Sequence, residues 1–118
     1  MGMFVPSTPT GYQEVIPGVR LKTLTHGALT HLTQFHLRKG SGLPRHSHPH
    51  EQTGYLVSGA MRLIIGEETF SVSPGDSWCI PGGVEHQALI DEDSVAIEVF
   101  SPVRDDYLAL RESKSSGS

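Results

Sequence analysis

The sequence predicts an all-β protein, folded as a sandwich or barrel of short antiparallel strands. Thirteen glycines and eight prolines are spread along the 118 residues and punctuate many short elements. The segments between them are short and rich in β-prone residues, and helical periodicity is almost absent. Many short strands at this spacing are typical of sandwiches and barrels rather than of helical or α/β folds.

Eight segments fit strands because they are β-prone and end near glycine, proline or other turn residues. A hairpin turn is expected over residues 65–69, around Gly66. Two Pro-Gly pairs, within 74–76 and 81–83, predict further turns. The expected strands cover residues 19–25, 30–37, 52–58, 61–65, 69–72, 77–80, 86–90 and 95–100.

The length of the chain predicts one domain over residues 1–118, because a second folded unit would not fit. The barrel core is expected at about residues 18–101. A short C-terminal helix is expected over 105–111, where an aspartate lies near its N-terminus. The tail 112–118 is polar and rich in small residues, so we expect it to be disordered.

Composition excludes several classes of partner. The net charge of −4 disfavours nucleic acid, and no apolar run is long enough to span a membrane. The N-terminal residues lack the charged and apolar regions of a signal peptide, so we expect a cytoplasmic location. Cys79 is the single cysteine, which excludes an internal disulfide and a cysteine-based zinc cluster. Because it lies in an apolar strand, we expect a buried, inert thiol.

Residues 45–55, RHSHPHEQTGY, place three histidines at alternate positions. In an extended backbone His46, His48 and His50 would face the same way. Two imidazoles alone hold an ion weakly, but His86 follows a Pro-Gly-Gly turn that would bring a later strand alongside. The spacing predicts a metal site with His46, His48 and His86, and His50 either supports these ligands or faces solvent. Solvated or hydrogen-bonded rings without a site role are expected for His26, His31 and His36.

A fourth ligand would come from Glu51 or Gln52. In an unbroken strand Gln52 shares the parity of His46 and His48, whereas Glu51 points the other way. Pro49 can turn the strand here, so parity alone leaves the choice open. An amide ligand would leave a divalent ion fully charged, which favours an anionic substrate over the oxygen chemistry of carboxylate-bound iron.

Two motifs resemble those of the cupins, which are double-stranded antiparallel β-barrels (jelly rolls) with a metal inside. The first reads GSGLPRHSHPHEQTGYLVSG over residues 40–59, and the second reads GDSWCIPGGVEH over 75–86. The resemblance covers about residues 40–100 and implies a metal held by the three histidines. It departs from the usual cupin pattern at Gln52, where most cupins have Glu, and the motif register also selects this residue as the fourth ligand.

The chain is similar in particular to the small cupins of pectin and alginate breakdown. These convert 4,5-unsaturated monouronates into linear 4-deoxy-5-keto uronates. The similar features are the HSHPHEQ run, a glutamine ligand and an acid-x-Phe-x-Pro-x-Arg ending. Those cupins bind metal with His, His, Gln and His and use a catalytic Asp, Phe and Arg. By position the resemblance implies His46, His48, Gln52 and His86 as ligands and Glu98, Phe100 and Arg104 as catalytic residues, with Glu in place of Asp.

The resemblance implies a metal-dependent ring opening without redox change. Glu98 would be the general acid/base, Arg104 would bind the anionic sugar, and Phe100 would wall the ring, with Tyr55 as a further cavity residue. Alternation over 95–100 puts Glu98 and Phe100 on one face, but both faces carry apolar residues, so the pattern does not identify the inward one. One divalent transition metal would be the cofactor, and Zn, Ni, Fe, Mn or Co suits these ligands.

Two other functions fit the same residues. One is a different metal-dependent cupin enzyme, either a dioxygenase or a sugar isomerase. The other is a non-catalytic cupin that binds a small molecule.

The expected partner is an anionic small molecule. A homodimer is also expected, because pairing through sheet edges would protect the exposed strands.

Overall fold

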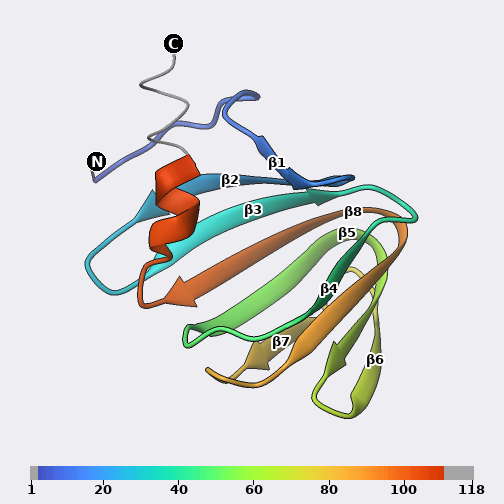
Figure 1. Cartoon of the computed structure of the whole chain (residues 1–118). Coiled ribbons are helices and arrows are strands. Elements are labelled where there is room, and N and C mark those ends of the chain that lie inside the picture. The colour runs from blue at the N-terminus through green and yellow to red at the C-terminus, as the bar shows by residue number, and fades with distance from the viewer. Residues whose placement is uncertain (1–2, 111–118) are drawn as a thin grey trace.

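The computed structural model describes residues 3–110, which form an antiparallel jelly-roll barrel and one short helix (Figure 1). The predicted all-β fold class is confirmed. Within these residues no helix is long and apolar enough to cross a membrane. The strands are β1 (Gln13–Ile16), β2 (Val19–His26), β3 (His31–Leu37), β4 (Gly42–His46), β5 (Glu51–Ile65), β6 (Glu68–Val72), β7 (Ser77–Ile80) and β8 (His86–Ser101).

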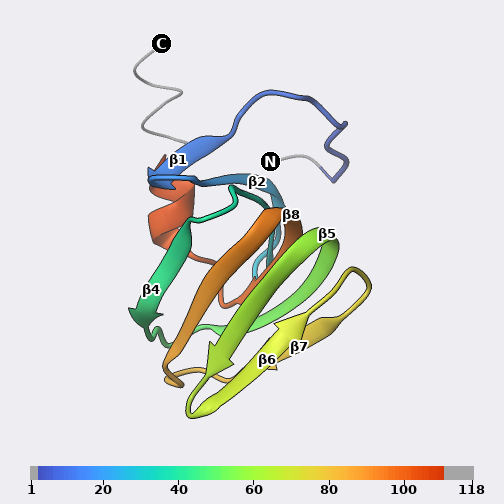
Figure 2. The same ribbon diagram turned by 90° about the vertical axis from the view of Figure 1, so that its right-hand side faces the viewer.

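The two long strands, β5 and β8, pair with each other along most of their length and belong to both walls of the barrel. The first half of β5 and the second half of β8 lie with β3 and β7, and their other halves lie with β4 and β6 (Figure 2). The pairing register shifts near Gly59, whose φ is 98°. A side chain at Gly59 would also overlap Ser94 of β8, so glycine permits the bend.

Most predicted elements are confirmed. Four predicted strands are the halves of β5 and β8, and four others match β2, β3, β6 and β7 to within one residue. β1 and β4 were not predicted, because β1 begins with the polar residues Gln13 and Glu14, and β4 contains Gly42 and Pro44. The turns at 65–69, 74–76 and 81–83 and a helix over 105–110 are also found, whereas the tail 112–118 lies outside the described residues.

The inward positions of the strands build an apolar interior that contains Leu21, Phe35, Leu56, Ile80 and Phe100, each at most 3% exposed. The prediction that Cys79 is buried is wrong. It is exposed because Trp78 and Ile80 take the more buried positions of the short strand β7.

Candidate metal centre and active site

Three predicted histidines converge from different segments of the chain. His46 at the end of β4 and His86 at the start of β8 are cross-strand partners. His48 lies in the loop after β4, and its carbonyl accepts a hydrogen bond from the N–H of Gly83 at 2.8 Å, which ties this loop to the turn before β8. One ring nitrogen of each histidine lies within 4.8 Å of the others. The chain therefore positions these three rings for a metal ion.

Backbone carbonyls fix the protonation of all three rings. Each Nδ1 lies within hydrogen-bond distance of a carbonyl oxygen, which can only accept, so each Nδ1 carries the proton. Each Nε2 then has a free lone pair, the arrangement typical of metal-ligating histidines. The bonds join His46 to Pro44 at 2.7 Å, His48 to His50 at 3.0 Å and His86 to Val84 at 2.9 Å.

The free lone pairs on the Nε2 atoms are suited to binding a cation. The Nε2 atom of His86 is buried and has no hydrogen-bond partner among residues 3–110. The Nε2 atom of His48 faces Oε1 of Gln52 at 3.1 Å, although the Gln52 amide nitrogen is directed to Glu98 and both facing atoms are acceptors. Burial lowers the pKa of His48, which disfavours a proton between them. Three imidazole nitrogens and an amide oxygen therefore suit a divalent transition metal.

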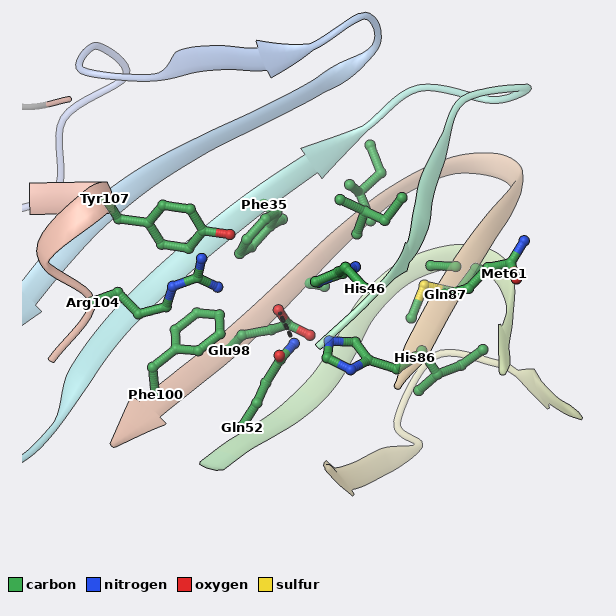
Figure 3. A pocket seen from close by; sticks show the side chains of 15 residues that line it. Phe35, His46, Gln52, Met61, His86, Gln87, Glu98, Phe100, Arg104 and Tyr107 are labelled. Atoms are coloured by element: carbon green, nitrogen blue, oxygen red, sulfur yellow. Dashed lines mark hydrogen bonds between the residues drawn. The ribbon is translucent and has the colours of Figure 1, made fainter. Parts of the chain in front are cut away.

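Glu98 lies next to this cluster and is only 8% exposed. The side-chain amide of Gln52 donates to its Oε2 at 2.7 Å (Figure 3). The indole of Trp78 donates to its Oε1 at 3.1 Å. Burial raises the pKa of Glu98 to about 7, against the opposing effect of these two donors. Such a carboxyl can give and take a proton near neutral pH. The side-chain amide of Gln52 thus has its oxygen facing His48 and its nitrogen facing Glu98.

Strand register explains these contacts. Gln52 pairs with Phe100 on one side of β5, and Gly54 pairs with both Glu98 and Trp78. Both Glu98 and Phe100 point inward, which settles the face that the sequence left open. The indole of Trp78 lies where a side chain at Gly54 would be, and from there it reaches Glu98.

Substituting Gly54→Ala is expected to displace the indole of Trp78 from Glu98, because the added methyl would overlap it. Trp78 is the single tryptophan, so a change in its fluorescence emission would report the displacement directly. Overpacking of this kind costs about 1–3 kcal/mol of unfolding free energy. Gly27→Ala is the control, since nothing lies within 4 Å of a Cβ there. Unchanged emission in Gly54→Ala would contradict the described contact.

Arg104 lies across the cavity from the histidines, with Glu98 between (Figure 3). Its Nε and Nη2 donate to the carboxylate of Asp106 at 3.1 and 2.7 Å. The guanidinium carbon lies 3.9 Å from the ring centre of Tyr107 and 5.0 Å from that of Phe100. The Arg104 side chain is only 11% exposed, and it lines the same cavity as Glu98.

Tyr107 and Trp78 are site residues that the sequence reasoning missed. Tyr107 follows the last strand, in the helix over 105–110, where no strand pattern points to it. Burial raises its pKa to about 12, so it is a neutral phenol. Trp78 lies inside the second cupin-like motif, and its parity with Ile80 was an available signal.

The structure separates the remaining candidates. Glu51 is exposed, as strand parity predicts. His50 orients His48 through its backbone carbonyl, and its own Nδ1 is buried without a partner among the described residues. The prediction that Tyr55 lines the cavity is wrong, because it is 48% exposed on the outer face of β5, between the inward positions of Gly54 and Leu56.

One cavity is lined both by His46 and His86 of the histidine cluster and by Glu98 and Arg104. It leaves about 30 Å³ for the centres of water-sized molecules. This is room for about two water-sized groups. Its polar lining consists of His46, Gln52, His86, Gln87, Glu98, Arg104 and Tyr107.

His31 is expected to make the free energy of unfolding depend on pH. Burial and the nearby charges of His26, Arg104 and His50 lower its pKa from 6.5 to about 4, against the opposing charge of Asp106. Between these values the unfolded chain binds a proton that the folded chain does not, so stability falls as pH falls. We expect a loss of about 2 kcal/mol between pH 7 and pH 5 from this residue.

Urea unfolding at the two pH values measures this loss, with metal removed so that the ligands do not contribute through metal release. The comparison is with His31→Asn, which removes the titrating ring. Equal pH dependence in the parent and in this variant would contradict the prediction.

The comparisons with known proteins agree with this geometry. A model of the cupin domain matches residues 33–101, and the chain therefore belongs to the cupin family. It is 29% identical over 101 residues to the pectin degradation protein KdgF of Dickeya dadantii (strain 3937), covering 84% of this chain and 92% of that one. The solved structure of KdgF from Halomonas sp. matches with a TM-score of 0.84 at 33% identity, covering 90% and 98%.

An RmlC-like cupin from Shewanella frigidimarina also matches, with a TM-score of 0.86 at 24% identity, covering 91% of this chain and 96% of that one. This likeness shows the fold alone. The predicted resemblance to cupins of pectin breakdown is confirmed by the two KdgF relatives.

Proposed function

We propose that the chain is a metal-dependent enzyme that converts 4,5-unsaturated monouronates into linear 4-deoxy-5-keto uronates. The observation that carries this proposal is the amide of Gln52, which links the histidine cluster to Glu98 in a cavity that Arg104 also lines. The likeness to KdgF, described in Dickeya as a pectin degradation protein, supports the same substrate class. The ion would supply positive charge for the substrate carboxylate. Its ligands would be His46, His48, Gln52 and His86.

The protein side chains supply the proton transfers. Glu98 donates its proton to C4 of the enol ether, water adds at C5, and the carboxylate of Glu98 takes up a proton from that water. The resulting hemiketal opens by cleavage of the bond between C5 and the ring oxygen, which leaves a ketone at C5 and, after loss of water from C1, an aldehyde. No electrons are transferred, and the product is an isomer of the substrate. Arg104 binds an anionic oxygen of the substrate through its guanidinium, and Phe100 covers the sugar ring.

The closeness of Glu98 explains why residue 52 is a glutamine rather than a glutamate. The Gln52 amide nitrogen lies 2.7 Å from the Glu98 carboxyl, and two carboxylates at such a distance would not both be ionised. An amide lets a metal ligand and a proton-transferring acid lie side by side. The histidine cluster itself includes no carboxylate among the described residues, unlike the two-histidine, one-carboxylate sites of iron oxygenases. This observation favours ring opening over the dioxygenase alternative.

The test is to incubate metal-loaded protein with a 4,5-unsaturated monouronate and to follow the loss of ultraviolet absorbance from its C4=C5 bond. NMR of the product should show the linear 5-keto form, and an oxygen electrode should register no uptake. A rate equal to the spontaneous one would overturn the proposal. Oxygen uptake with ferrous protein would indicate a dioxygenase instead, and tight binding without turnover would indicate a binding protein.

A homodimer is also proposed, through a face of the barrel rather than a strand edge. The outward side chains Tyr55 and Val57 of β5 are each 48% exposed, and Val95, Ile97 and Val99 beside them on β8 are half-buried. A two-fold axis would bring this apolar face against its own copy. Light scattering should give twice the 12.8 kDa chain mass, and a monomeric mass would overturn the dimer.

The single domain and the cytoplasmic location stay predictions.

A further inference from the structure

Strand β3 carries two polar side chains, both 0% exposed, that bind the backbone beneath the proposed catalytic residues. The hydroxyl of Thr33 donates to the carbonyl of Glu98 at 2.9 Å. The backbone N–H of Arg104 donates to Nδ1 of His31 at 3.1 Å. Nε2 of His31 therefore carries the ring proton and donates to the hydroxyl of Thr23 at 2.8 Å. Both nitrogens of a fully buried imidazole are thus engaged.

We propose that His31 is a positioning residue for Arg104, an inference that rests on the function proposed above. Arg104 lies where the chain leaves β8 and enters the helix, and its carbonyl accepts the N–H of Leu108 at 3.1 Å. Its own N–H precedes the first helical turn and has no partner within the helix. His31 supplies that partner. The ring cannot turn away without leaving buried polar groups unsatisfied, so it fixes the backbone of Arg104.

His31 differs from the other residues that contact Arg104 because it lies on a different part of the chain. Asp106 and Tyr107 contact the Arg104 guanidinium, but both lie only two or three residues further along the same segment of the chain. His31 belongs to β3, which pairs with the half of β8 that carries Glu98. The imidazole therefore sets the distance between the proposed substrate-binding cation and the proposed acid, where an error of about 1 Å can cost about a hundredfold in rate.

Two amide substitutions separate the two hydrogen bonds of the ring. In His31→Asn the amide oxygen takes the place of Nδ1 and still accepts the Arg104 N–H, but the contact with Thr23 is lost. In His31→Gln the amide reaches Thr23 and the acceptor for Arg104 is lost. We expect kcat/KM for the uronate to fall at most about threefold in His31→Asn and at least about tenfold in His31→Gln. Metal content should equal that of the parent in both.

Hydrogen exchange over residues 102–108 gives a readout that does not need turnover. The Arg104 amide should exchange slowly in the parent and in His31→Asn, and faster in His31→Gln. Equal losses of rate and protection in the two variants would show a merely structural histidine and overturn the inference. If the parent does not turn over the uronate, the proposed function fails, while the exchange comparison still tests the positioning by His31.

Discussion

Replacing His86 with alanine is expected to remove metal binding and reduce turnover of the uronate to the spontaneous rate. His86 is 4% exposed, and its Nε2 has no hydrogen-bond partner among the described residues. Removing it leaves two imidazoles and an amide, which hold an ion weakly. Elemental analysis should show a fall from about one ion per chain to less than about one-tenth.

Thermal unfolding provides the second measurement for this substitution. An ion present at about a thousand times its Kd stabilises the folded state by about 4 kcal/mol. A chelator should therefore lower the Tm of the parent, and added metal should restore it, whereas the Tm of His86→Ala should respond to neither. His36→Ala is the matched control, because His36 lies outside the cluster and bonds to Gln34. Full metal content in His86→Ala would refute the proposed ligand set.

The fold was largely predictable because its determinants are local. Turn residues and short β-prone segments located six of the eight strands, two of which each appeared as a pair of shorter ones. The continuity of β5 and β8 was not predictable, because Gly59 reads as a chain break although here it allows a bend against Ser94. The bend depends on the pairing of β5 with β8, which are distant in the sequence.

The candidate site was predictable only in part, for a related reason. The cupin motif register selects Gln52 over Glu51, and in the structure Gln52 is buried and Glu51 is exposed. Trp78 and His31 contribute through hydrogen bonds to residues distant in the sequence, and Tyr107 packs against the distant Phe35. No spacing along the chain encodes these contacts. His31, for which no site role was predicted, binds the backbone of Arg104.

Converting Glu98 to glutamine is expected to lower kcat by about 10²–10⁴-fold while leaving metal content unchanged. The amide keeps the size of the side chain and removes the transferable proton. Burial raises the pKa of Glu98 to about 7, so the native side chain can be both donor and acceptor in one turnover near neutral pH. The ultraviolet assay of uronate loss measures the effect, and elemental analysis measures the metal. A rate within about threefold of the parent would remove Glu98 from the mechanism.

The matched variant Glu98→Asp tests whether the reach of the acid matters. Asp is the residue that the resemblance implies at this position, but here the carboxyl is held at 2.7 Å by Gln52 and at 3.1 Å by Trp78. Shortening the side chain by one methylene would draw the carboxyl back from both donors. We expect a loss of about ten- to a hundredfold in kcat, smaller than in Glu98→Gln because the proton remains. If Glu98→Asp is instead faster than the parent, the Trp78 contact hinders the reaction, and Trp78→Phe should then raise the parental rate.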